Sequence, residues 1–387
     1  MTDFDKLIDR RGSDCIKWHA YDPDVLPLWV ADMDFRSPEP VIRALHERVD
    51  HGVFGYGHAP AELREVLAAR LARLYGWQIP AEAVVFLNGV VPGFNLVARA
   101  FAAPGEGLLV QTPVYYPFLD VPRNTGLTGD EMELTRRPDG QYEVDFDRFE
   151  ATITDKTRVF LLCNPHNPVG RAFRRDELAR LAEICLRRHV LICSDEIHCD
   201  LLFRGVRHTP IAALAPEVAA RTITFMAPSK TFNLAGLYCA FAIITDPELR
   251  QRFHEARADL VGWPNLLGYT AALAAYRDGQ PWLDQVLAYL EANRDFVHQY
   301  VGEHLPGVTM ARPEATYLAW LDCRSAGIPG NPHEFFLKEA RVALNDGAKF
   351  GKGGAGFVRL NFACPRATLT EALERMRNAL QTLWRTL

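Results

Sequence analysis

Lys230 stands alone among apolar and small residues in the stretch APSKTFNLAGL, residues 227–237. The nearest charged residues along the chain are Arg221 and Asp246. A lysine is rarely buried without a partner, and burial lowers its pKa, so that part of it becomes a neutral amine. Such an amine can form a Schiff base with an aldehyde. The alternative interpretation is a side chain that reaches the surface and keeps its charge in water.

Four other groups of polar or aromatic residues follow short apolar runs that are typical of buried strands. They are NGVVPG (88–93), TPVYYPF (112–118), NPHNPVG (164–170) and SDEIHCDL (194–201). The first leads into a predicted helix, whose free N–H groups suit a phosphate, and the second offers an aromatic wall. The third supplies asparagines, and the fourth supplies Asp195 and Glu196, acids that need a cation or a donor. Each group alone also fits an ordinary turn or an exposed strand end.

These groups and Lys230 are expected to meet, because ligands bind beyond the carboxyl ends of the strands in open α/β sheets. Together they offer a phosphate cradle, an aromatic wall, an amide, an acid and an amine. That set matches pyridoxal 5′-phosphate (PLP), which has a phosphate, a flat ring, a hydroxyl, a basic nitrogen and an aldehyde. Lys230 would bond to the aldehyde, and an acid opposite the ring nitrogen would keep that nitrogen protonated.

The elements that must position these residues alternate between strands and helices. The predicted buried strands are 83–87, 107–111, 158–163, 189–195, 221–226 and 240–245. Helical patterns lie between them at 91–102 and 174–189. This alternation predicts an α/β fold with a large, mostly parallel sheet that has helices on both faces.

The pattern changes near residue 285. A long predicted helix (282–305) is followed by strands at 315–322 and 356–363 and by a final helix at 367–384. We therefore expect a large PLP-binding domain over 46–285 and a smaller α+β domain over 286–387. The irregular, Pro-rich segment 1–45 is expected to pack with the smaller domain.

Composition excludes several classes of protein. The 387 residues carry a net charge of −5, which gives no broad basic surface for nucleic acid. The polar N-terminus is no signal peptide, and the longest nearly apolar run (234–244) is too short to span a bilayer. The eight cysteines form no C-x-x-C pair, which indicates reduced thiols in a cytoplasmic protein. The twelve histidines show no metal-binding spacing, so we expect no metal.

Several ordered motifs identify a known family. They are LWVADMDF (28–35), TPVYYPF (112–118), CNPHNPVGR (163–171), SDEIHCDL (194–201), APSKTFNLAGL (227–237), YLAWLDC (317–323), ALNDGAKFG (343–351) and GFVRLNFACP (356–365). With them the chain resembles the fold-type I PLP-dependent enzymes, class I/II aminotransferase-like, over essentially its whole length. Within that group it is similar to the PatB/MalY-type cystathionine β-lyases, or cysteine S-conjugate C–S lyases. The resemblance implies α,β-elimination of L-cystathionine or a related L-cysteine S-conjugate to a thiol, pyruvate and ammonia.

The resemblance also implies contacts to the cofactor. Lys230 would hold PLP covalently and act as the general base, and Asp195 would pair with the pyridine nitrogen. Tyr115 would stack on the ring and stand near the Cα proton of the substrate. The other implied contacts are the amides of Val90 and Val91 at the phosphate, Asn167 and His198 at the ring hydroxyl, and the hydroxyl of Ser229.

Substrate and partner contacts follow from the same resemblance. Arg359 matches the arginine that grips the α-carboxylate of an amino-acid substrate, and Ala31 matches a backbone contact to that carboxylate. Tyr56 matches a tyrosine that reaches the phosphate from the neighbouring subunit, which implies a homodimer with shared active sites. Members of this branch also bind a transcription regulator, so a regulator partner stays open.

An aminotransferase on the same scaffold is the alternative function. Many aminotransferases place Arg or Lys eight residues after the Schiff-base lysine, at the phosphate, and this chain has Tyr238 there. That difference favours a lyase. Ala315 stands where the lyases mostly have glycine, and the stretch GWPNLLG (262–268) is unusual, so the identity of the cysteine conjugate is left open.

Overall fold

A large mixed sheet forms the centre of the protein in the computed structural model, which describes residues 2–258 and 260–386. Within those residues the sheet has seven strands in the order β2-β10-β9-β8-β7-β3-β4. Their bounds are β2 Val84–Leu87, β3 Gly107–Thr112, β4 Thr128–Glu133, β7 Thr157–Cys163, β8 Leu191–Asp195, β9 Thr222–Met226 and β10 Ala240–Ile243. Strand β10 runs antiparallel to both of its neighbours, and the other neighbouring strands pair in parallel. The predicted mostly parallel sheet is confirmed.

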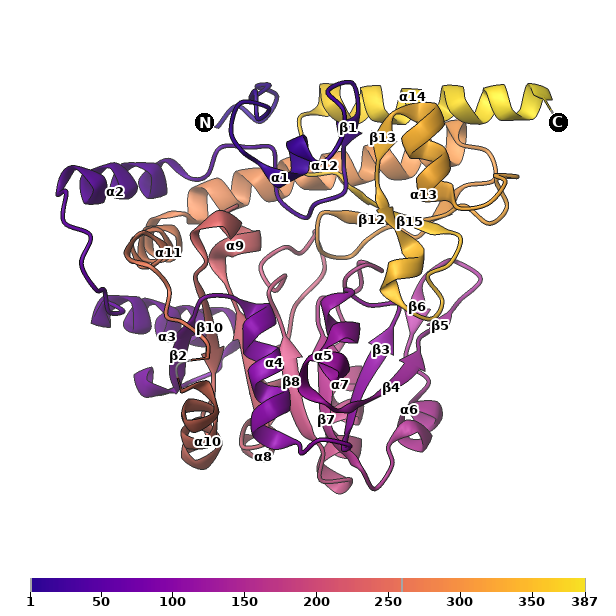
Figure 1. Ribbon diagram of the computed structural model, residues 1–387. Coiled ribbons are helices and arrows are strands. Elements are labelled where there is room, and N and C mark those ends of the chain that lie inside the picture. The colour runs from indigo at the N-terminus through magenta and orange to yellow at the C-terminus, as the bar shows by residue number, and fades with distance from the viewer. Residues whose placement is uncertain (1, 259, 387) are drawn as a thin grey trace.

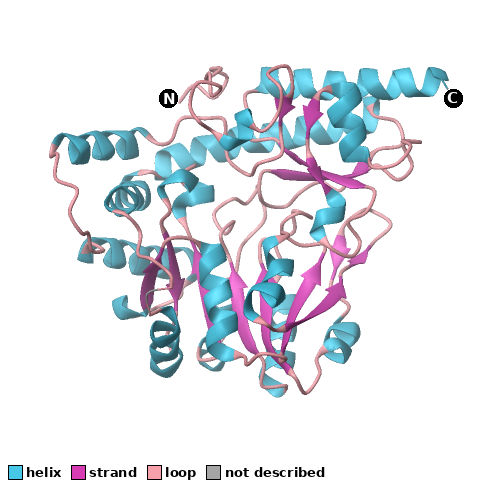
Figure 2. Cartoon of the chain, in the orientation of Figure 1, coloured by secondary structure: helices cyan, strands magenta, loops and turns pink. Residues whose placement is uncertain are grey.

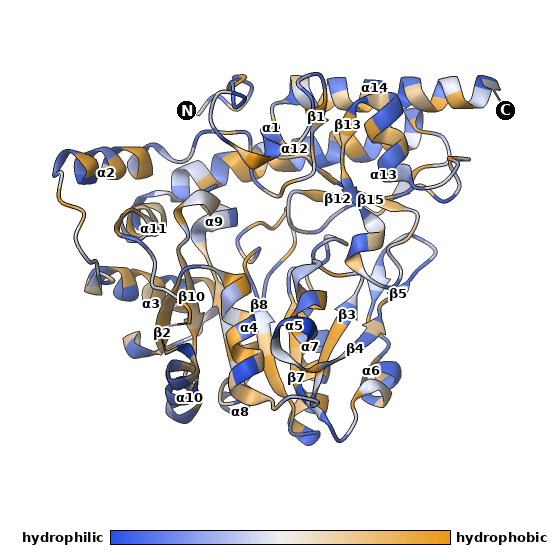
Figure 3. Ribbon diagram, viewed as in Figure 1, coloured by the Kyte–Doolittle hydropathy of each residue, from blue (hydrophilic) through white to orange (hydrophobic). Residues whose placement is uncertain are grey.

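Helices cover both faces of this sheet, as Figures 1 and 2 show. Successive strand residues point to opposite faces, so that Leu161 joins one apolar cluster and Phe160 the other. The helices around the sheet are α3 Ala61–Tyr75, α4 Val90–Phe101, α5 Pro117–Thr125, α6 Phe146–Thr152, α7 Arg175–Arg187, α8 Pro216–Ala219, α10 Pro247–Arg257 and α11 Leu266–Asp278. Because both faces are buried, the inner strands read as apolar runs, and Figure 3 shows much of them in orange. The edge strand β4 has the polar sequence TGDEME and is partly exposed.

A smaller antiparallel sheet lies above the large one in Figure 1. Its order is β11-β12-β15-β14, and helices α12 and α14 pack together beside it. The bounds are α12 Gln280–His304, β11 Thr309–Met310, β12 Leu318–Asp322, α13 Pro332–Phe335, β14 Asn345–Asp346, β15 Phe357–Asn361 and α14 Arg366–Thr386. The predicted helices and strands of this part are confirmed, with ends that differ by a few residues.

The N-terminal segment begins beside the smaller sheet and helices α12 and α14 (Figure 1). It contains α1 Ile16–His19, β1 Leu26–Pro27 and α2 Glu39–Asp50. Strand β1 pairs in parallel with β13 Val342–Ala343, while α2 packs on α11. The domain limits at 45 and 285 stay a prediction, and α12 runs continuously across the second of them.

Short elements complete the fold. Strands β5 and β6 form a separate pair, and α9 carries the lysine of the predicted site. Their bounds, with those of the short 3₁₀ and π turns, are β5 Thr135–Arg136, β6 Tyr142–Glu143, α9 Pro228–Thr231, η1 Ala81–Ala83, η2 Ile211–Ala213, η3 Ala235–Leu237, η4 Phe336–Ala340 and η5 Gly347–Phe350. Among the described residues, no helix combines the length and apolar character needed to cross a bilayer, and no His, Cys, Asp or Glu group has a metal-binding arrangement.

Candidate active site

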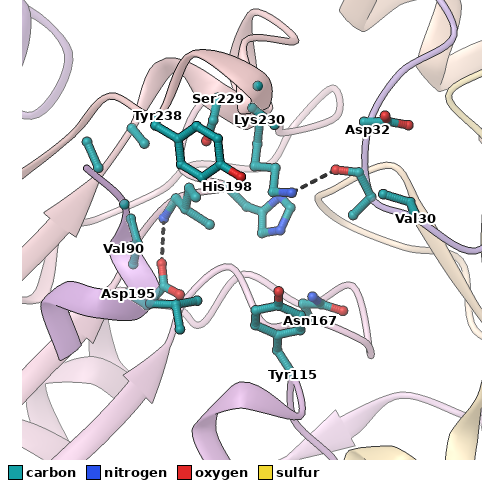
Figure 4. A pocket seen from close by; sticks show the side chains of 18 of the residues that line it. Val30, Asp32, Val90, Tyr115, Asn167, Asp195, His198, Ser229, Lys230 and Tyr238 are labelled. Atoms are coloured by element: carbon teal, nitrogen blue, oxygen red, sulfur yellow. Dashed lines mark hydrogen bonds between the residues drawn. The ribbon is translucent and has the colours of Figure 1, made fainter. Parts of the chain in front are cut away.

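A cavity of about 630 Å³ is lined by residues at the carboxyl ends of the central strands, by the N-terminal segment and by the smaller sheet. It is lined by every residue predicted for the site except Tyr56. In Figure 4 Lys230 enters this cavity from above, while Asp195, Asn167 and Tyr115 lie below it. Residues separated by more than 300 positions therefore share one cavity.

Lys230 lies in the last turn of the short helix α9, directly after β9. Its Nζ donates a hydrogen bond to the carbonyl oxygen of Ala31 at 2.7 Å, and it forms no ion pair with a carboxylate of the described residues. Asn233 holds the N-terminal segment here through hydrogen bonds of 2.9 Å with the backbone of Met33. Burial and the positive charge of Arg359 lower the pKa of Lys230 to about 8, against the smaller raising effects of Asp32 and Asp195. The amine is thus neither extended into bulk water nor held by a counter-ion, and it is readily made neutral.

Asp195 is the last residue of β8, and its side chain is buried at the cavity wall. One carboxylate oxygen accepts the backbone N–H of Ile197 at 3.1 Å. Burial raises the pKa of Asp195 to about 7, against the smaller lowering effects of that hydrogen bond and of Lys230. A buried carboxylate with so little compensation is suited to a cation that binds beside it.

Arg359 on β15 reaches across from the smaller sheet. Its guanidinium donates to the side-chain oxygen of Asn167 at 3.0 Å, to the carbonyl of Trp29 at 2.8 Å and to the side-chain oxygen of Asn345. Burial lowers its pKa to about 10, and its Nε has no hydrogen-bond partner among the described residues. A buried guanidinium that meets only neutral oxygens has capacity left for an anion such as a carboxylate.

Tyr115 and His198 form further parts of the wall. Burial raises the pKa of the Tyr115 hydroxyl to about 12, so this group is protonated at neutral pH. Burial also lowers the pKa of His198 well below its ordinary value, which leaves a neutral ring. The Nδ1 atom of His198 has no hydrogen-bond partner among the described residues. Both side chains can therefore offer neutral polar atoms to a ligand.

The phosphate end of the predicted site lies at the start of α4. Gly89 precedes this 12-residue helix, and Val90, Val91 and Ser229 line the cavity there. The first N–H groups of a helix have no partner within the helix, and the helix dipole is positive at this end. Tyr238 also lines the cavity, in a left-handed conformation with φ 49°.

Tyr56 lies away from this cavity. It is fully exposed and does not contact the pocket of its own chain. Its contribution to a neighbouring subunit stays a prediction.

The donors and acceptors of the cavity fit PLP. Lys230 lacks an anion, Asp195 lacks a cation, and the unpartnered Nδ1 of His198 can bond to a polar ring substituent. Asn167 uses its oxygen for Arg359, which leaves its N–H groups for an acceptor such as a ring hydroxyl. Lys230, Asp195, Asn167, Ser229 and the α4 amides are therefore the groups that would hold the cofactor.

Some cavity residues were not among those predicted. Asn345 belongs to the ALNDGAKFG motif, and its pairing with Arg359 on the neighbouring strand explains its contact with the guanidinium. Trp29 contributes a carbonyl, which no side-chain pattern could reveal. Arg10 and Cys15 also line the cavity, and nothing in their local sequence connects them with it.

Comparison with known proteins places the chain in a family. The model of the family "Aminotransferase class I and II" matches residues 23–376, so the chain belongs to that family. Cystathionine beta-lyase PatB of Bacillus subtilis (strain 168) is 40% identical over 385 residues, which cover 97% of this chain and 99% of PatB.

Two solved structures show the same fold. The crystal structure of OvoB has 45% identity and a TM-score of 0.94, over 98% of this chain and 99% of OvoB. Cystalysin from Treponema denticola, which contains pyridoxal 5′-phosphate, has 34% identity and a TM-score of 0.95, over 99% of this chain and all of cystalysin. The expected fold-type I architecture is thus confirmed over nearly the whole chain.

Proposed function

We propose that the protein is a PLP-dependent C–S β-lyase that cleaves L-cystathionine or a related L-cysteine S-conjugate. The observation that carries the proposal is one cavity holding an amine without a counter-ion (Lys230), an acid without a cation (Asp195) and a buried guanidinium (Arg359). The likeness to PatB and cystalysin over nearly the whole chain supports a lyase among the reactions of this family.

Different side chains would bind different parts of the cofactor and of the substrate. When bound, PLP supplies an aldehyde carbon and an electron-withdrawing ring that accepts the negative charge formed at Cα. Asp195 would face the ring nitrogen, Asn167 and His198 the ring hydroxyl, and Tyr115 the plane of the ring. The α4 amides and Ser229 would bind the phosphate.

Arg359 and Lys230 would act on the substrate. The Arg359 guanidinium would bind the α-carboxylate in a bidentate ion pair, and the Ala31 N–H would add a hydrogen bond. The neutral Lys230 amine removes the Cα proton as general base. The Cβ–S bond then breaks with its electron pair on sulfur, and water completes the conversion of the carbon skeleton to pyruvate and ammonia.

The proposal includes a cytoplasmic homodimer with shared active sites. Several large apolar side chains are exposed on two neighbouring segments, namely Val49, Val53, Phe54, Tyr56, Leu260 and Trp263. The segments lie side by side, because Gly57 contacts Leu266. An apolar surface of this kind suits a second copy of the chain, which could bring Tyr56 to the neighbouring cavity. All eight cysteines are free, as suits a reducing compartment.

The test is an assay of the purified protein with L-cystathionine. Visible absorbance reports bound PLP, and pyruvate and free thiol are followed together. Equal amounts of thiol and pyruvate from a yellow protein support the lyase. Loss of the yellow colour with an amino acid, without pyruvate, would support an aminotransferase instead. A colourless protein that PLP does not restore would overturn both assignments.

A further inference from the structure

Tyr317 touches the same backbone oxygen as Lys230. The Tyr317 hydroxyl donates a hydrogen bond of 2.8 Å to the Ala31 carbonyl, which also accepts the Lys230 amine at 2.7 Å. Tyr317 is fully buried, and its ring meets the His198 ring edge-on, with centroids 6.1 Å apart. The two donors therefore share the two lone pairs of one oxygen.

The smaller sheet fixes the turn that carries this oxygen. Arg359 donates to the carbonyl of residue 29, and Asn361 donates to the carbonyls of residues 30 and 32 at 2.6 Å each. Tyr317 completes the series at residue 31. Four successive carbonyls are thus held by side chains of the smaller sheet or the segment directly before it, and only the one at Ala31 also meets Lys230.

The backbone before Tyr317 is strained. Thr316 is a β-branched residue in the left-handed region, with φ 71°, where such residues are rare. Its N–H donates to the carbonyl of Leu201 at 2.8 Å, and Phe203 donates to the carbonyl of Glu314 at 3.1 Å. This pairing ties the segment after His198 to the start of β12. Strain of this kind persists where surrounding contacts enforce it, and it clusters at functional sites.

We propose that Tyr317 is a positioning residue for Lys230. Its hydroxyl fixes the Ala31 carbonyl, and this carbonyl accepts a hydrogen bond from the Lys230 amine whenever Lys230 is not bonded to the cofactor. The inference rests on the proposed function for its role in turnover. A carbonyl that already accepts from tyrosine is a weaker acceptor for an ammonium group, and the hydroxyl dipole presents its positive end to the amine. Tyr317 thereby favours the neutral form of Lys230 that can remove a proton.

The variant Tyr317→Phe tests this inference, because it keeps the ring and removes only the hydroxyl. The matched control is Tyr142→Phe, which removes a buried tyrosine hydroxyl that accepts from Trp320 at 3.2 Å, outside the cavity. Competitive labelling of the cofactor-free protein with fluorodinitrobenzene over a range of pH, resolved by peptide mass spectrometry, gives the pKa of Lys230. Thermal unfolding shows that each variant is folded.

We expect the pKa of Lys230 to rise by about one unit in Tyr317→Phe and to stay unchanged in Tyr142→Phe. In the PLP-loaded enzyme, kcat near neutral pH should then fall about tenfold while KM is retained, since the fraction of neutral amine falls tenfold per pH unit. An unchanged or lowered pKa in Tyr317→Phe, or an equal rise in the control, would overturn the inference. The labelling needs no turnover, so it stays decisive even if cystathionine is not cleaved.

Discussion

Lys17 and Lys230 have opposite electrostatic surroundings. Lys17 is fully buried, and its Nζ lies 2.8 Å from Asp34 and 3.3 Å from Asp32. Burial alone would lower its pKa, but the two carboxylates outweigh burial and raise it. At Lys230 burial acts in the same direction, the nearby cation Arg359 adds to it, and the pKa falls to about 8.

Burial lowers the pKa of both lysines, and the neighbouring charges decide whether the net shift of that pKa is upward, as at Lys17, or downward, as at Lys230. Around Lys17 the carboxylates are themselves held, because Arg10 bonds to both and Trp18 donates to Asp34 at 3.0 Å. This cluster fixes the charge of Lys17 and ties the N-terminal segment together. Lys230 meets only a carbonyl, which leaves its amine free to change its protonation state.

The largest effect is expected from Lys230→Ala. The proposed covalent link to PLP and the general base are lost together, so kcat should fall by a factor on the order of 10⁴. Any PLP that the variant still binds would not be covalently attached. Gel filtration after denaturation should therefore remove it, even when borohydride has been added beforehand. Pyruvate formation and visible absorbance measure the two losses, and full activity in this variant would contradict the assigned role.

Lys17→Met should instead cost stability. Removal of Lys17 breaks its buried ion pair with Asp34, but Asp34 keeps Arg10 as a cation, so we expect a loss of about 3 kcal/mol of unfolding free energy. Chemical denaturation measures this loss, and the matched Lys230→Met variant of the cofactor-free protein should not be destabilised. Equal losses in the two variants would show that burial alone governs both sites.

Arg359→Lys tests the proposed contact between this guanidinium, which lies near Lys230, and the substrate carboxylate. A lysine keeps the charge but cannot form the bidentate pair, so kcat/KM should fall about 10²-fold, mainly through KM. Steady-state kinetics with L-cystathionine checks this. A change in kcat alone would argue against a carboxylate contact in the ground state.

The smallest effect is a difference in pH dependence. In the cofactor-free protein the folded pKa of Lys230, about 8, lies below its ordinary value of 10.5. The cost of holding the ammonium is therefore complete below pH 8 and is relieved as the pH rises toward 10.5. Wild type should gain stability over Lys230→Met in that interval.

Lys17 should show the opposite sign. Its folded pKa is raised, so its stabilisation is complete below its ordinary value of 10.5 and is lost as the pH rises through the folded pKa. Denaturation of wild type and Lys17→Met at increasing alkaline pH measures this. A stability gain at Lys17 in the same range would break the contrast.

Local sequence determined the elements and the residues at their ends. The apolar runs predicted six of the seven strands described in the large sheet, and Lys230, Asp195 and Asn167 were readable because each lies at or shortly after the end of such a run. Strand β4 was not predicted, because its sequence TGDEME is polar. The reversed direction of β10 was not readable, because a buried strand has the same composition in either direction.

Only the tertiary structure decided the charge states and the substrate side of the cavity. Lys17 stands in the polar stretch SDCIKWHA, yet it is buried because Asp32 and Asp34 fold onto it. Tyr317 and Ala31 meet across 286 positions. Electrostatic and hydrogen-bond energies depend on distances of a few ångströms, whereas sequence separation gives no such distance. The sequence therefore indicated which groups could react. The packing of distant segments determined which of these groups have the protonation state and the open hydrogen-bonding positions that reaction requires.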